Sequence, residues 1–132
     1  EGLGRGAAPS LVKLGLGDNK IGPAGAEAFA AALRRGALPK LAYLSLLANP
    51  LGNKGMAALA APLRKMPALT RLGLYQIEID DEGVASLFAD LGRDDFKALG
   101  TLWLGYNRIT DACMTTLIAA IPHIEVHWRE ID

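Results

Sequence analysis

Four segments of this sequence can be laid over one another, and this repetition constrains the fold more than any other feature. Each segment has the pattern Leu-x-x-Leu-x-Leu, and the pattern recurs at intervals of 30, 28 and 30 residues. Its leucine positions are all filled: Leu11, Leu14, Leu16, Leu41, Leu44, Leu46, Leu69, Leu72, Leu74, Leu99, Leu102 and Leu104. A repeat of this length is one supersecondary unit, which buries its apolar face only by stacking on a neighbour. The sequence therefore predicts a row of stacked units.

A second apolar pattern follows the leucines in each unit and has the period of a helix. Apolar residues spaced i, i+3, i+4 and i+7 predict a helix with one buried stripe. The stripes are Ala26, Phe29, Ala30 and Leu33; Met56, Leu59, Ala60 and Leu63; Val84, Leu87, Phe88 and Leu91; and Met114, Leu117, Ile118 and Ile121. Helix N-caps are expected at Gly22, Gly52, Asp80 and Thr110. Basic residues near three predicted helix ends, among them Arg34, Arg64 and Arg93, suit the negative pole of the helix dipole.

These two patterns together resemble a leucine-rich repeat protein, and the long unit with a full helix is similar to the ribonuclease-inhibitor-like subfamily. The resemblance covers residues 11–121. It implies an α/β fold, a right-handed β-α solenoid that forms a segment of a horseshoe with about four repeats. Parallel strands would line the concave face, and helices would line the convex face.

The resemblance also gives structural roles to two sets of recurring residues. It implies that Asn19, Asn49 and Asn107 turn inward and satisfy backbone groups after each strand, while Ile77 replaces the asparagine in the third unit. That third turn must then find its hydrogen bonds elsewhere. Gly25, Gly55 and Gly83 recur at one helix position, where Cys113 stands in the fourth unit. Close packing explains the small residues at this position.

We expect residues 1–132 to form a single leucine-rich repeat domain. Its repeats would span 11–40, 41–68, 69–98 and 99–123. Residues 1–10 would be the tail of a preceding repeat, because 3–9 parallel 33–39 in sequence. Residues 124–132 would form a C-terminal cap, in which alternation places Ile124, Val126 and Trp128 on one face of a last strand.

The composition excludes several classes of partner. Fourteen basic and fourteen acidic residues give a formal net charge of zero. The excess of basic residues that is typical of a nucleic-acid binder is therefore missing. No apolar run approaches the roughly 18 residues that a membrane-spanning helix needs, so no membrane insertion is expected. The single cysteine, Cys113, cannot form an internal disulfide. A reducing, intracellular location, cytoplasmic or organellar, is therefore favoured.

The sequence carries no motif for catalysis, so we expect no enzyme activity and no cofactor. Phosphate-binding, nucleophile-elbow and zinc-protease patterns are missing, and Cys113 is interpreted as an inert packing residue. His123, Glu125 and His127 would share one face of the last strand, where they could hold zinc. A solvated strand face explains them more simply, and no metal site is predicted. Asp94 and Asp95 are interpreted as part of a solvated loop.

The strand positions on either side of the central leucine are the candidate binding surface, because their side chains point away from the core. They place Lys13, Tyr43, Arg71 and Trp103 on adjoining strands, with Tyr75 and Tyr106 just beyond the strand ends. Tyr, Trp and Arg dominate the binding energy of protein interfaces. We therefore predict a non-enzymatic interaction module whose concave face binds a protein or peptide. The alternative is a structural accessory subunit, held in a larger multiprotein assembly through its helical or end surfaces.

Overall fold

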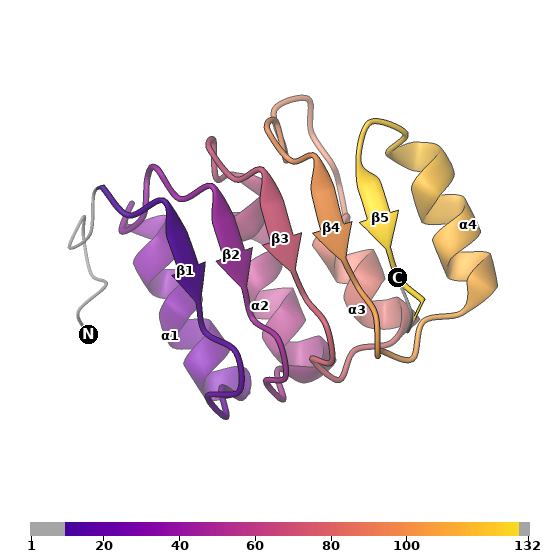
Figure 1. Ribbon diagram of the computed structural model, residues 1–132, viewed down its shortest axis with the longest axis horizontal. Coiled ribbons are helices and arrows are strands. Elements are labelled where there is room, and N and C mark those ends of the chain that lie inside the picture. Colours follow the sequence, from indigo (N-terminus) through magenta and orange to yellow (C-terminus); the bar gives the residue numbers. More distant parts are fainter. Residues whose placement is uncertain (1–9, 130–132) are drawn as a thin grey trace.

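The computed structural model describes residues 10–129, which form a parallel sheet covered on one side by helices (Figure 1). The strands are β1 (Lys13–Gly15), β2 (Tyr43–Ser45), β3 (Arg71–Gly73), β4 (Thr101–Trp103) and β5 (Glu125–His127). The helices are α1 (Pro23–Arg34), α2 (Gly52–Arg64), α3 (Asp81–Leu87) and α4 (Asp111–Ala120). Strands and helices alternate, and the strand order in the sheet is the order along the chain. The predicted β-α solenoid is confirmed.

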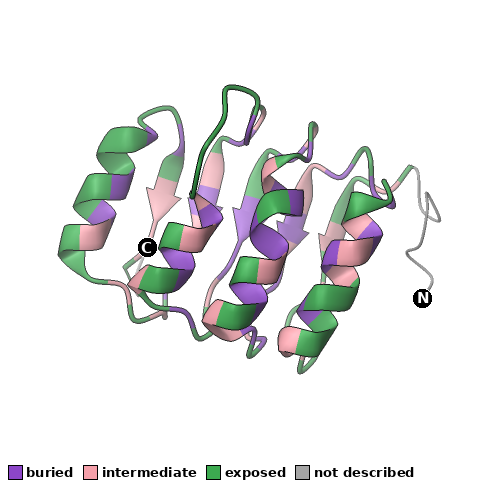
Figure 2. Cartoon of the chain, turned by 180° about the vertical axis from the view of Figure 1, so that it is seen from behind, coloured by how far each residue is buried: buried purple, intermediate pink, exposed green. Residues whose placement is uncertain are grey.

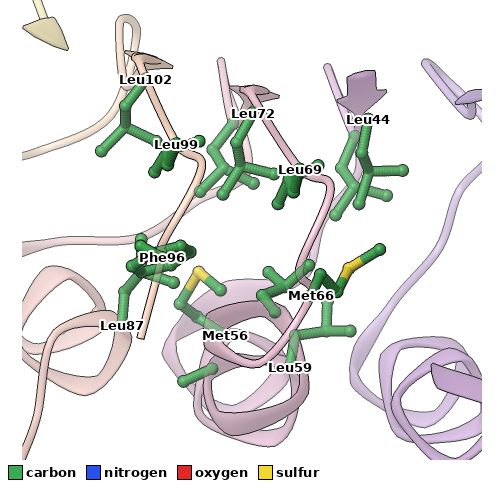
Figure 3. Close-up of a cluster of buried hydrophobic side chains, with 14 of the residues drawn as sticks. Leu44, Met56, Leu59, Met66, Leu69, Leu72, Leu87, Phe96, Leu99 and Leu102 are labelled. Atoms are coloured by element: carbon green, nitrogen blue, oxygen red, sulfur yellow. The ribbon is translucent and has the colours of Figure 1, made fainter. Parts of the chain in front are cut away.

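Equivalent residues of successive units lie side by side in the sheet. Leu14 pairs with Leu44, Leu44 with Leu72, Leu72 with Leu102, and Leu102 with Val126. Because side chains alternate along a strand, this central row faces the helices while its neighbours face the other way. Figure 3 shows the row standing over side chains from α2, α3 and the connecting segments. The leucine repeat therefore builds one continuous core between sheet and helices.

Burial of the leucines increases away from β1. Every pattern leucine of the second, third and fourth units is at most 2% exposed, whereas Leu11, Leu14 and Leu16 of the first unit are only half-buried. β1 forms an edge of the sheet, so its leucines have a described neighbouring unit on one side only. Figure 2 shows the buried positions concentrated on the inner sides of the middle elements. The expected tail of a preceding repeat, residues 1–10, lies outside the described range except for Ser10.

The third helix differs from its prediction. α3 ends at Leu87, and Leu91, which was expected in the buried stripe, is 41% exposed. Phe96 fills the space instead: it is 2% exposed, and its ring centroid lies 5.4 Å from that of Phe88. Figure 3 shows Phe96 beside Leu87 and Leu99. Because the helix is short, Arg93 lies in the segment after α3 and not at a helix end.

The last helix also departs from its predicted stripe. Met114, Leu117 and Ile121 are buried, but Ile118 is 40% exposed. Its position in the stripe would face a following helix, and α4 is the last helix among residues 10–129. The fourth unit is instead completed by a strand, β5, which pairs in parallel with β4. Trp128 packs against the core after this strand.

The asparagine prediction is correct for two of three residues. Asn49 is 1% exposed; its Oδ1 accepts from the Asn19 and Ile21 amides, and its Nδ2 donates to the Leu16 and Leu46 carbonyls. Asn107 makes the same four bonds two repeats later. Asn19 is exposed and its side chain donates only to the nearby Gly17 carbonyl, so its inward assignment was wrong. No described repeat precedes it to supply the missing partners.

Main-chain bonds serve the turn that faces Ile77, where the asparagine is missing. The Gly52 amide donates to the Ile77 carbonyl at 2.9 Å, and the Leu51 amide donates to the Asn49 carbonyl at 2.9 Å. The Ile77 side chain itself is fully buried. An apolar residue is therefore tolerated here, because the backbone takes over the hydrogen bonding.

Small residues allow the helices to approach closely, as expected. A Cβ added to Gly83 would lie 2.7 Å from both Asn53 Oδ1 and Ile79 Cβ, and one added to Gly55 would lie 3.3 Å from Ala26 Cβ. Asp80 and Thr110 cap their helices by accepting from the Glu82 and Cys113 amides. Gly52, expected as a cap, is the first residue of α2.

Asp95 is buried, so its assignment to a solvated loop was wrong. Its side chain is 4% exposed and accepts from Lys65 Nζ at 2.7 Å and from the Gly92 amide at 3.0 Å. Arg64 Nε lies 3.5 Å from the same carboxylate. Asp95 thereby joins the end of α2 to the segment after α3.

The division into repeats at residues 40, 68 and 98 and the capping role of residues 124–132 remain proposals, and 130–132 lie outside the described range. Within residues 10–129, no helix has both the length and the apolar character to cross a membrane.

Candidate functional site

The sheet presents one face to the helices and a second face outward, which we call the strand face. It consists of two rows of aligned positions on β1 to β5. The first row contains Lys13, Tyr43, Arg71, Thr101 and Glu125, and the second contains Gly15, Ser45, Gly73, Trp103 and His127. Parallel pairing in register brings these residues together although neighbours in a row lie 24 to 30 positions apart in sequence. Alternation along each strand directs their side chains away from the core.

Tyr43 is the centre of a cluster on this face. The Nζ atom of Lys13 lies 5.8 Å from the centroid of the Tyr43 ring, and Cζ of Arg71 lies 4.8 Å from it. Each cation is attracted by the negative face of the aromatic ring. Trp103 meets the same ring edge to face, with centroids 6.2 Å apart and an angle of 84° between the planes. Four of the six predicted binding residues therefore form one connected group.

Trp103 is held from its other side by the last strand. The His127 ring stacks on it with centroids 6.0 Å apart and planes at 17°. His127 Nε2 in turn lies 2.9 Å from Glu125 Oε2. The sequence placed these two residues on a solvated strand face or, less simply, among possible zinc ligands, and their contact with the aromatic cluster was not predicted. The sequence could have predicted this contact. If Val126 continues the central leucine row, then His127 aligns with Trp103 on the neighbouring strand.

Tyr75 and Tyr106 form a second, smaller group beyond the strand ends, which we call the turn group. Their ring centroids lie 6.5 Å apart. Tyr106 is 55% exposed and has a φ of 61°, a left-handed conformation that disfavours large side chains. The Tyr75 ring lies over Gly105, where an added Cβ would be 2.8 Å from Tyr75 Cε1. Leu47, 42% exposed, occupies the position in the second unit that Tyr75 occupies in the third.

The structure bears on two chemical groups of residues 10–129, the possible metal ligands and the Cys113 thiol. Among residues 10–129 no three His, Cys, Asp or Glu side chains are grouped so that they could hold a metal ion. Burial and the negative charge of Asp81 raise the pKa of the Cys113 thiol, which disfavours the reactive thiolate. The half-buried position of Cys113 agrees with its interpretation as a packing residue.

The family described as Leucine Rich repeat matches residues 7–30, the first strand and most of the first helix. A solved structure of leiomodin-1 actin-binding site 2 superposes with a TM-score of 0.72 at 14% sequence identity, covering 92% of this chain and 72% of that one. No curated protein sequence matches. The chain has the fold of leucine-rich repeat proteins, and its first repeat matches the family. Its placement in the ribonuclease-inhibitor-like subfamily stays a prediction.

The helix side of the chain carries two apolar grooves. One, of about 450 Å³, lies between the ends of α1 and α2 and is lined by Leu33, Leu38, Ala61, Pro62 and Met66 together with Arg34 and Lys65. The other, of about 510 Å³, lies between α3 and α4 and includes Phe88, Cys113 and Leu117. The leucine-rich repeat chain therefore has a polar, aromatic strand face and a more apolar helix side.

Proposed function

We propose that this leucine-rich repeat chain is a non-enzymatic binding module that holds a protein or peptide partner on its strand face, the concave side in this fold. The observation that carries the proposal is the connected cluster of Lys13, Tyr43, Arg71 and Trp103. Aromatic and arginine side chains supply large contact areas with polar handles, which is why they dominate interface hot spots.

The cluster also has the rigidity that favours binding. Tyr43 is fixed between two cations, and Trp103 between Tyr43 and His127. Rings already held in place lose little freedom when a partner arrives, and this lowers the entropic cost of association. The turn group, with Tyr106 more than half exposed, would extend the same contact surface beyond the strand ends.

The resemblance to leiomodin-1 actin-binding site 2 supports the general class of this proposal. That structure is named for binding a protein, and it shares the fold. At 14% identity the similarity concerns the fold alone, so actin is not proposed as a partner of this chain.

Affinity capture from cell lysate with quantitative mass spectrometry tests the proposal. We expect Trp103→Ala and Tyr75→Ala to lose the proteins that the wild type captures, with thermal unfolding changed little. Gly15→Trp provides a steric version of the test. Nothing lies within 4 Å of the position that a Cβ would take there, so a large side chain fits and covers the strand face.

A matched variant on the helix side distinguishes the alternative of a structural accessory subunit. Ala61 is exposed and lines the groove between α1 and α2, and Ala61→Arg would fill that groove. Capture that survives Gly15→Trp and Trp103→Ala but is lost in Ala61→Arg would favour the accessory subunit. Loss of capture in the strand-face variants alone supports the binding module.

A further inference from the structure

The charges of the strand face are segregated, although the whole chain is neutral. The outward positions of β1 to β4 carry two basic residues, Lys13 and Arg71, and no acidic residue. The carboxylate of Glu125 on β5 is directed to His127, at 2.9 Å. With fourteen basic and fourteen acidic residues in the chain, this imbalance belongs to the surface and not to the composition.

Lys13 and Arg71 have no carboxylate partner within residues 10–129. Neither residue takes part in the ion pairs of that range, which include those of Arg64, Lys65 and His127. Both Lys13 and Arg71 are exposed, and both converge on the Tyr43 ring, at 5.8 and 4.8 Å from its centroid. Two like charges held near one ring repel each other, and a bound anion would relieve that repulsion.

From this geometry we propose that the strand face recognises an acidic peptide segment. An Asp or Glu side chain of the partner binds the outward ends of Lys13 and Arg71 beside the Tyr43 ring, and an apolar side chain packs on Trp103. This inference rests on the proposed function and adds the chemistry of the partner. Arginine suits the role because its planar guanidinium binds a carboxylate with two parallel hydrogen bonds.

The shape of the strand face also fits an extended segment. The second row begins with Gly15 and Ser45, and Gly15 has open space above it. This shallow strip of small residues runs beside the Lys13–Tyr43–Arg71 row and ends at Trp103. A peptide backbone following the strip has its side chains alternately beside the cations and against the indole.

A library of random 16-residue peptides displayed on phage and selected on the whole chain is the probe. We expect the enriched sequences to contain an excess of Asp and Glu over Lys and Arg and at least one aromatic or aliphatic residue. The binding of the most enriched peptide is then measured in solution by fluorescence anisotropy.

Charge-reversed variants locate the binding. We expect the double variant Lys13→Glu with Arg71→Glu to weaken the affinity for the peptide by roughly tenfold or more, because the variant places negative charges opposite those of the peptide. The matched control, Lys54→Glu with Arg93→Glu, changes the net charge equally at exposed positions on α2 and after α3, and we expect little effect. Unfolding midpoints of both variants are measured alongside.

Each other outcome has its own meaning. Peptides that Gly15→Trp blocks but that show no acidic excess would overturn this inference and leave the proposed function standing. Peptides insensitive to Gly15→Trp, or a selection without enrichment, would overturn both. Equal binding of a dT16 oligonucleotide would also overturn the inference, since the surface would then respond to negative charge alone.

Discussion

Asn107 reaches back into the preceding repeat, where its Oδ1 accepts a hydrogen bond from the Ile77 amide at 3.0 Å. The same atom accepts from the Ile79 amide, and Nδ2 donates to the carbonyls of Leu74 and Leu104. One side chain thus satisfies two amides and two carbonyls where the chain leaves β3 and β4. Unpaired buried backbone groups lower the stability of a fold, so such an asparagine stabilises the contact between one repeat and the next.

Replacing this asparagine tests that role. We expect Asn107→Ala to lower the free energy of unfolding by roughly 2–4 kcal/mol, because it leaves several backbone groups without partners. Asn19→Ala is the matched control at the same repeat position; its side chain is exposed, and we expect a loss below about 0.5 kcal/mol. Urea unfolding followed by circular dichroism measures both, and equal losses would contradict the assigned role.

Asp95 gives the fold a pH dependence. Hydrogen bonds from the Gly92 amide and from Lys65 hold the pKa of its carboxyl below the ordinary value of an aspartate. The carboxylate therefore stabilises the fold above the pKa of unfolded aspartate, about 3.9, and this contribution is lost as the pH falls through the lower, folded pKa. Asp81, whose pKa is lowered by hydrogen bonds from Thr110, acts in the same direction.

We expect Asp95→Asn to lower the unfolding midpoint at pH 7 and to reduce its fall between about pH 5 and pH 2. Part of that fall remains, because Asp81 still titrates. Asp94→Asn is the control, since Asp94 is the exposed neighbour. Thermal melts at a series of pH values measure the profile. A variant profile parallel to that of the wild type would mean that Asp95 does not contribute to it.

Gly83 tests the close approach of α2 and α3. An added Cβ would lie 2.7 Å from Ile79 Cβ and from Asn53 Oδ1, so we expect Gly83→Ala to cost roughly 1–3 kcal/mol despite the higher helix propensity of alanine. Gly25→Ala, at the same repeat position, would place its Cβ 3.0 Å from the Cγ2 methyl group of Ile21 and 3.8 Å from Ile21 Cβ, so its contacts are less close. We expect a smaller loss there, and a gain for Gly83→Ala would refute this account of the glycine.

The leucine spacing was sufficient to predict a row of stacked units, and the resemblance that it carries implied the β-α solenoid. It could not predict the loop after α3. There Phe96 replaces Leu91 in the core and Asp95 is buried beside Lys65, and both depend on contacts between segments distant in sequence. The candidate site was predictable in its members, since register follows from the repeat. The stacking of His127 on Trp103 needed the last strand to be aligned, and that strand lacks the leucine pattern.

The central leucine row offers a last prediction about how stability is distributed along the solenoid. Leu72 on β3 is fully buried between neighbouring units, so we expect Leu72→Ala to cost roughly 2–5 kcal/mol through lost burial and a cavity. Leu14 on the edge strand β1 is half-buried, and Leu14→Ala should cost roughly 1–2 kcal/mol, since less area is lost and the site can relax. Denaturant unfolding of the two variants measures the difference. Equal costs would mean that β1 is packed as tightly as the interior strands, and the graded burial from the edge to the middle of the sheet would then not reflect graded stability.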